Sequence, residues 1–163
     1  MSSCGRRSIS LSVRLRPVAQ ADLPELFEFQ RDPEGAQMAA VVPRDHPSFL
    51  SHWEKVLNDP SVVARAITVE GVLVGDISCF SIDAADFVGY SVAREHRGRG
   101  IATRALSLLL QEVAKRPLHA RAARHNLASI RVLERCGFVL VGYEHSPATE
   151  RFLACEEALL VLR

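Results

Sequence analysis

Residues 97–103 read Arg-Gly-Arg-Gly-Ile-Ala-Thr and lie directly before an amphipathic stretch of the sequence. Gly98 and Gly100 allow backbone conformations that are closed to other residues, and they let the main chain approach a ligand closely. A helix that starts at the end of this segment offers unpaired N–H groups and the positive end of its dipole. With the charge of two arginines added, the segment predicts a site for a phosphate or pyrophosphate group.

Two common phosphate-binding motifs do not fit this segment. A P-loop requires G-x-x-x-x-G-K-[ST], and no lysine is present here. A dinucleotide-binding loop requires G-x-G-x-x-G and an acidic residue about twenty positions later. Thr103 stands where the third glycine would be, and residues 120–122 read Ala-Arg-Ala. Both motifs therefore fail on specific residues.

What remains is the pattern R-x-x-G-x-A at residues 97–102, embedded in GYSVAREHRGRGIATRAL at 89–106. A second segment, NLASIRVLERCGF, follows at 126–138. Together they resemble the acyl-CoA loop and a later helical segment of the GNAT superfamily of acyl-CoA-dependent N-acyltransferases. The likeness is strong over these segments and between them, and weaker over the rest of 11–163. It is closest to the ribosomal-protein alanine acetyltransferase (RimJ/RimL-like) group.

The resemblance implies an α+β fold in which helices flank a central mixed, mostly antiparallel sheet. It also implies an N-acetyltransferase that moves an acetyl group from acetyl-CoA directly to a primary amine in a ternary complex, without a metal. The acceptor is then a protein N-terminal α-amine or a small-molecule amine, and the sequence does not indicate which.

Carried over to this chain, the resemblance assigns roles to residues. The N–H of Val92, at the end of a strand, would bond the pantetheine arm of coenzyme A and polarise the thioester carbonyl. Asn126 would bond the same arm from the other side. Backbone N–H groups of the loop, those of Arg99, Gly100, Ala102 and Thr103, would hold the pyrophosphate. The full set of expected coenzyme A contacts is Val92, Arg97, Gly98, Arg99, Gly100, Ile101, Ala102, Thr103 and Asn126.

The proton donor for the departing sulfur is less well marked. In many relatives a tyrosine of the second segment has this role, but here the position is Leu133, and neither Tyr90 nor Tyr143 falls there. Ser129 lies three residues after Asn126, hence on the same helical face, and could bond the sulfur directly or through water. A thiol with a pKa of about 8.5 could also leave without a dedicated acid. Val92 and Ser129 are the expected catalytic residues.

Four carboxylates are candidates for the base that accepts the amine proton: Glu28, Asp76, Asp86 and Glu95. A solvated surface group is the alternative for each of them. Keeping a lysine neutral near pH 7 costs about 4–5 kcal/mol, against roughly 1 kcal/mol for an α-amine. Without an evident strong base, the sequence favours an α-amine or another weakly basic acceptor.

The sequence also predicts the environment of several further residues. The spacing of Trp53 with its apolar neighbours predicts a core residue, and His52 is expected on the surface of the same helix. His125 could touch coenzyme A or have no role. Cys136 is expected to be a small buried apolar residue and not a nucleophile. The acceptor pocket is expected from residues 28–60 and 144–155, which contain no diagnostic motif.

Composition limits the class of protein. The chain has 163 residues, 48% hydrophobic and 24% charged, with a net charge of +1, so no overall field attracts nucleic acid or an anionic membrane. Its four cysteines form no C-x-x-C pair, which argues against a zinc site and favours a reducing cytoplasm. No apolar run approaches the length of a membrane span. We expect a cytoplasmic monomer or homodimer with no nucleic-acid or membrane partner.

Hydrophobic periodicity and turn residues predict the order β-α-α-β-β-β-α-β-α-β-β in a single N-acetyltransferase domain, 9–163, after a flexible tail, 1–8. Helices are expected from Asp22, over 46–58, from Ile101 to about Lys115, and over 126–137. Strands are expected over 9–15, 62–69, 72–82, 87–92, 118–124, 138–144 and 156–163, with a two-residue turn at Glu70-Gly71.

Two other functions compete with catalysis. Because the usual tyrosine is missing, the chain could be a non-catalytic domain that binds or senses acyl-CoA. The Arg-Gly-Arg-Gly run also resembles RNA-binding segments. Against RNA binding stand the low net charge, the lack of nearby aromatic residues for base stacking, and the helix that follows at once.

Overall fold

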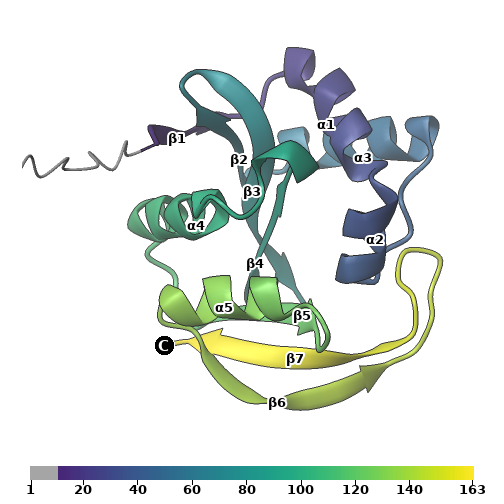
Figure 1. Cartoon of the computed structure of the whole chain (residues 1–163), viewed down its shortest axis with the longest axis vertical. Coiled ribbons are helices and arrows are strands. Elements are labelled where there is room, and N and C mark those ends of the chain that lie inside the picture. The colour runs from purple at the N-terminus through teal and green to yellow at the C-terminus, as the bar shows by residue number, and fades with distance from the viewer. Residues whose placement is uncertain (1–10) are drawn as a thin grey trace, which may run out of the picture.

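The computed structural model describes residues 11–163 and contains one seven-stranded sheet with helices on both faces (Figure 1). The elements are β1 (Val13–Pro17), η1 (Gln20–Asp22), α1 (Leu23–Gln30), α2 (Pro33–Ala39), α3 (His46–Asn58), β2 (Val63–Val69), β3 (Val72–Ile82), β4 (Ala85–Val92), η2 (Arg94–His96), α4 (Ile101–Glu112), β5 (Leu118–Ala123), α5 (Leu127–Arg135), β6 (Val139–Ser146) and β7 (Cys155–Leu162). The strand order is β1-β2-β3-β4-β5-β7-β6. Neighbouring strands are antiparallel except β4 and β5, which confirms the predicted α+β class.

The order of strands and α-helices follows the prediction with one addition, the short helix α2. Its start has ordinary helix signals that the sequence analysis missed: the Asp32 side chain accepts the backbone N–H of Glu34, and Pro33 takes the first position. The helix α4 ends at Glu112, earlier than predicted, because Val113 turns into an extended conformation and remains buried. The expected tail and the first residues of the expected first strand lie outside the described residues.

Two tight turns connect the central antiparallel strands. Glu70 and Gly71 both have positive φ, 50° and 78°, so the predicted two-residue turn joins β2 to β3. Asp83 and Ala84 also have positive φ, 49° and 65°, and join β3 to β4. Such turns suit the right-handed twist of a hairpin. As a result β4 starts at Ala85, two residues before its expected start.

The helices form two layers. α4 and α5 cover one face of the sheet, where Leu106, Leu109 and Leu133 are fully buried. α1 and α3 pack against β2 and β3 in a second cluster that contains Phe49 and Trp53, both nearly inaccessible to solvent. Figure 1 shows α1, α2 and α3 gathered at one side of the molecule and α4 at the other. Trp53, at 6% exposure, is the core residue that its spacing predicted.

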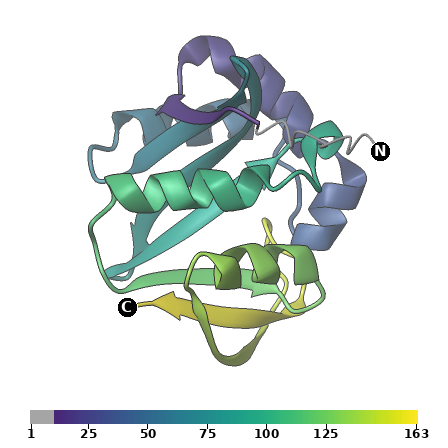
Figure 2. The ribbon, with the colours of Figure 1, turned by 60° about the vertical axis from the view of Figure 1, so that its left-hand side comes forward.

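The sheet opens between β4 and β5. These two strands are paired only at Asp86 with Leu118 and at Phe87 with His119. Beyond Phe87, β4 continues for five residues to Val92 without a partner on this edge, while its other edge remains paired with β3. Figure 2 shows the two strands meeting at one end and diverging toward the other. A strand with one free edge therefore ends in the middle of the molecule.

Candidate active site

The loop before α4 has the backbone that its glycines predicted. Gly98 and Gly100 both have a φ of 76°, and nothing lies within 4 Å of the place where either would carry a Cβ. Gly100 caps α4, and the first intrahelical bond runs from the N–H of Arg104 to its carbonyl. Within the described chain no side chain caps this helix, so the N–H groups of its first turn are available to a ligand. This open, N–H-rich loop fits a pyrophosphate.

Arg97 has a different position from the one expected. Its Nε donates to the carbonyl of Val92 at 3.0 Å, and its Nη1 bonds Asp32 Oδ2 at 2.9 Å. The guanidinium therefore ties the end of β4 to the start of α2, and its expected contact with phosphate stays a prediction. The backbone of Arg97 remains in the loop, and the side chain of Arg99 is exposed to solvent.

The N–H of Val92 points into the opening between β4 and β5. Its register partner on β3 is Gly75, and the N–H of the next residue, Ala93, donates to the carbonyl of Val74 at 2.7 Å. In an antiparallel ladder, residues alternate between pointing both backbone groups at the partner strand and pointing both away. Ala93 points toward β3, so Val92 points away from it, to the side where β5 has diverged.

Across the opening, β4 and α5 are joined by two hydroxyl groups. The Tyr90 hydroxyl lies 2.8 Å from Ser129 Oγ and donates to the Ser129 carbonyl at 3.0 Å. Burial raises the pKa of Tyr90 to about 12. Asn126 caps α5 by accepting the Ser129 N–H at 3.2 Å, which leaves its amide nitrogen free to donate. Ser129 and Asn126 thus sit together as expected, with a tyrosine that linear spacing had set aside.

A pocket of about 170 Å³ lies on the other face of the sheet. Asp76 of β3 and Ser91 of β4 are directly opposite each other on its floor. Apolar side chains of α1 and α3 form the wall, and Arg44, His52 and Arg151 line the remainder. Because Ser91 precedes Val92, the pocket and the opening of the sheet meet at the end of β4.

Comparison with known proteins decides the family. A model of the acetyltransferase (GNAT) domain matches residues 12–139. The chain belongs to the GNAT acetyltransferase family. The probable N-acetyltransferase YjcK of Bacillus subtilis (strain 168) is 35% identical over 74 residues, which are 40% of this chain and 41% of that protein. The match therefore spans about two fifths of the curated relative.

Solved GNAT structures share the fold over nearly the whole chain. The spermidine N-acetyltransferase of Vibrio cholerae, in complex with CoA and spermine, has a TM-score of 0.79 and 16% identity, with 92% of this chain and 94% of that chain covered. RimL, a ribosomal L7/L12 alpha-N-protein acetyltransferase in complex with coenzyme A, has a TM-score of 0.77 and 17% identity, with 94% and 95% covered. The predicted family, the fold and the class of acetyl-CoA-dependent acyltransferase are confirmed.

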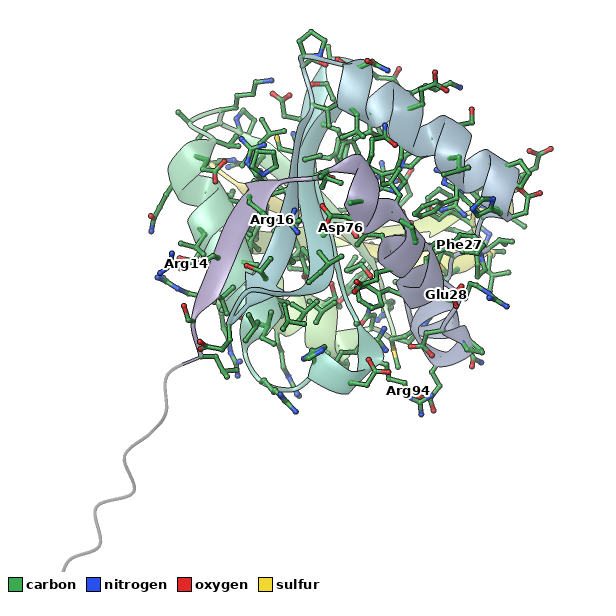
Figure 3. The ribbon with its side chains drawn as sticks, turned by 90° about the horizontal axis from the view of Figure 1, so that it is seen from above. Arg14, Arg16, Phe27, Glu28, Asp76 and Arg94 are labelled. Atoms are coloured by element: carbon green, nitrogen blue, oxygen red, sulfur yellow. The ribbon has the colours of Figure 1, made fainter. Side chains whose placement is uncertain are left out.

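Of the four carboxylates considered as bases in this GNAT domain, only Asp76 lines the pocket. Figure 3 labels Asp76 on the central strands and Glu28 on α1. Glu28 is exposed on α1 and paired with Arg31. Asp86 binds Ser81 and Lys115 near the start of β4, and Glu95 is exposed in η2. The Asp76 carboxylate accepts no hydrogen bond from any residue of 11–163, and burial raises its pKa to about 7. A carboxyl group with that pKa is well suited to accept a proton near neutral pH.

The predicted surface position of His52 is wrong. His52 was expected on the surface of its helix, but it is half-buried in the pocket with Nδ1 3.3 Å from Arg44 Nη2. Burial and then the charges of Arg44, Arg151 and Lys55 lower its pKa to about 4, so the imidazole is neutral at neutral pH. A helix periodicity cannot reveal that arginines from other segments surround the same side chain.

The structure also places His125, Cys136 and Leu133. His125 Nε2 lies 3.2 Å from the Gln37 carbonyl and joins the loop before α5 to α2. Cys136 is half-buried, and its Sγ lies 3.5 Å from the carbonyl of Thr103, where burial raises the pKa of the thiol. Such a thiol is a poor nucleophile. Leu133, which replaces the usual tyrosine, is 1% exposed in the core.

A substitution at Gly75 tests whether β4 places the Val92 N–H. A Cβ at Gly75 would overlap the Ser91 carbonyl oxygen and stand 3.0 Å from Val92 Cα, so β4 must move. We expect Gly75→Ala to lower kcat/KM about 10- to 100-fold, because displacements near 1 Å have such effects, and to destabilise the fold by about 1–3 kcal/mol. Steady-state kinetics and urea unfolding measure both effects.

Gly142→Ala is the matched control, because nothing lies within 4 Å of its Cβ position on β6. Wild-type kinetics for Gly75→Ala would contradict the account of the strand.

Proposed function

We propose that residues 9–163 form a single N-acetyltransferase domain that transfers the acetyl group of acetyl-CoA directly to a primary amine in a ternary complex. The observation that carries the proposal is that the pyrophosphate loop, the Val92 N–H and Asp76 all meet at one end of β4. The acyl-CoA side opens between β4 and β5, and the amine side is the pocket beneath α1 and α3. Both substrates can therefore reach the same atoms.

The loop and the two strands supply the coenzyme A site. Open space at Gly98 and Gly100 lets the backbone approach the pyrophosphate, and the first turn of α4 offers its N–H groups and dipole. The free amide of Asn126 is placed to bond the pantetheine arm. Acetyl-CoA supplies the acetyl group already activated as a thioester. Neighbouring structures that contain CoA support this assignment.

The Val92 N–H polarises the thioester carbonyl and stabilises the negative charge that develops on its oxygen. Pairing with β3 fixes the backbone of Val92 on one side. The hydrogen bond from Arg97 to the Val92 carbonyl fixes it on the other side. A fixed donor needs no reorganisation when charge develops, and such a donor typically contributes about 10²–10³ in rate.

Asp76 accepts the proton of the attacking amine. Its carboxylate faces the pocket, and Ser91 beside it provides a second polar group. The charged and titratable groups that share the pocket are Arg44, His52 and Arg151, and His52 stays neutral near pH 7. A base with a pKa near 7 matches a weakly basic amine such as an α-amine better than a lysine side chain.

Ser129 and Tyr90 lie on the opposite side of the opening, where Ser129 can donate a hydrogen bond to the departing thiolate. The single hydrogen of the Tyr90 hydroxyl, which is donated to the Ser129 carbonyl, can rotate to Ser129 Oγ at 2.8 Å, and the serine hydrogen is then free to point at the sulfur. This pair takes the place of the tyrosine that Leu133 replaces. It also removes the only argument for a non-catalytic sensing domain, which was the absence of that tyrosine.

An RNA-binding role for the arginine segment loses support from the ion pairs. Arg97 bonds Asp32 at 2.9 Å and Arg94 bonds Glu34 at 3.0 Å, so two of the four arginines within residues 94–104 already have carboxylate partners. None of the helices within 11–163 is long and apolar enough to cross a membrane. Cytoplasmic location and a monomeric or homodimeric state stay predictions.

The function and its base are tested together by the release of coenzyme A thiol from acetyl-CoA across a panel of amines. We expect kcat for the best amine to fall about tenfold per pH unit below pH 7, because Asp76 is then protonated and cannot accept the proton. Asp76→Asn should lower kcat by about 10²–10⁴ with little change in the affinity for coenzyme A.

Asp86→Asn, at the far end of β4, is the control and should keep the wild-type rate. Release with no amine at all would overturn the proposed enzyme, and full activity of Asp76→Asn would overturn its base.

The hydroxyl pair is tested by Tyr90→Phe and Ser129→Ala. Each should lower kcat roughly tenfold, less than a full general acid contributes because a thiolate leaves readily. The double variant should be only slightly slower than either single one, since both changes break the same hydrogen-bonded pair. Tyr143→Phe removes an exposed tyrosine hydroxyl on β6 and serves as control. Unchanged kcat in both single variants would remove the pair from the mechanism.

A further inference from the structure

The pocket beside Asp76 contains two arginines that the proposed chemistry does not use. Within residues 11–163, Arg44, Arg65 and Arg151 are half-buried, and the other arginines are exposed. Arg65 forms an ion pair with Glu112 at 2.8 Å. Neither Arg44 nor Arg151 pairs with any carboxylate of the described chain, and both line the pocket. Half-burial without a counter-ion distinguishes them from the surface arginines.

The structure holds both arginines in place. The backbone of Arg44, between α2 and α3, exchanges two hydrogen bonds with the side chain of Gln30, at 2.8 and 2.9 Å. Arg151 lies in the loop between β6 and β7, donates to the carbonyl of Val42, and accepts the Val42 N–H at 2.7 Å on its own carbonyl. Segments far apart in the sequence are thus fastened together around the pocket. Figure 1 shows the loop between β6 and β7 lying beside α2.

The cost of this arrangement points to a missing partner. Burial lowers the pKa of Arg44, and burial and then the charge of Arg44 lower the pKa of Arg151. The neutral imidazole of His52 beside Arg44 offers no negative charge to offset them. Two partly desolvated guanidinium groups of like charge are unfavourable unless an anion binds them, and carboxylates and phosphates fit the planar guanidinium best.

We propose that the acceptor is a small amine that also carries an anionic group, a carboxylate or a phosphate, which Arg44 and Arg151 bind while the amine faces Asp76. The inference rests on the proposed function, because it assigns the substrate of the same site. The pocket of about 170 Å³ is smaller than the roughly 300 Å³ at which pockets for drug-sized ligands begin. It therefore suits a molecule of amino-acid size.

Charge also separates this pocket from those that take polycations. One GNAT relative of the same fold is crystallised with spermine, which is cationic at each of its amines. In this chain a polyamine would bring positive charge toward Arg44 and Arg151, which like-charge repulsion opposes. An amine with an anionic group places its positive end at Asp76 and its negative end at the arginines.

The test compares amines with and without an anionic group, using thiol release by the wild-type protein. The pairs are α-amino acids against their carboxamides, and phosphoethanolamine against ethanolamine, with spermidine as a polycation. We expect the anionic member of at least one pair to have a kcat/KM at least tenfold higher, and the better pair identifies carboxylate or phosphate. Equal or better turnover of the neutral member in both pairs, or of spermidine over every anionic amine, would overturn the inference while leaving the enzyme intact.

Substitutions locate the anion site. Arg44→Gln and Arg151→Gln should each raise KM for the preferred anionic amine at least tenfold and leave kcat/KM for its neutral analogue nearly unchanged. Arg65→Gln is the matched control, a half-buried arginine outside the pocket. Unchanged KM in both pocket variants, with circular dichroism showing them folded, would contradict the site.

Binding measurements distinguish a failure of the anion site from a failure of the proposed function. Calorimetry of the N-acetylated amino acid against its N-acetylated carboxamide reports the anion site without any turnover. A tenfold preference for the acid supports the anion site even if no amine is acetylated, in which case the proposed function fails alone. Equal affinity for acid and amide, and for the N-acetylated forms of phosphoethanolamine and ethanolamine, overturns the anion site whatever the turnover.

Discussion

The separation of β4 from β5 is the constraint on which the rest of the site depends. One edge of β4 is held by the β3 ladder, where Gly75 lets the strands approach so closely that a Cβ would not fit. The other edge loses its partner after Phe87. A strand that is rigid on one side and unpaired on the other presents the Val92 N–H in a fixed direction. The same strand turns Tyr90 toward α5 and Ser91 toward the pocket, so groups for both substrates share one rigid support.

Features set by local sequence were predicted well. Glycines at 98 and 100 require positive φ before a helix, Glu70-Gly71 forms a tight hairpin, and Gly137 ends α5 with the N–H of Phe138 bonded to the carbonyl of Leu133. Alternating and helical periodicities predicted the strands and the helix α4. Each of these depends on residues within a few positions of one another, which is why a single sequence could reveal them.

Features set by distant contacts could not be predicted in the same way. Arg97 was expected at a phosphate, but Asp32, 65 positions earlier, binds its guanidinium. His52 belongs to the pocket because Arg44 and Arg151 come from other segments. Asp76 differs from the other candidate bases in lining the pocket, which no spacing shows. Tyr90 could have been found, since strand alternation places it on the same face as Val92, yet its contact with Ser129 spans 39 positions.

The most direct measurement of the central claim is the ¹H–¹⁵N NMR signal of the Val92 amide with coenzyme A and with acetyl-CoA. The two ligands share every atom except the acetyl group, so a difference at Val92 reports contact with the thioester. We predict a downfield shift of the Val92 amide proton with acetyl-CoA relative to coenzyme A, as expected for a new hydrogen bond to a carbonyl. Coincident Val92 signals at saturation with both ligands would contradict the proposed geometry of the transfer.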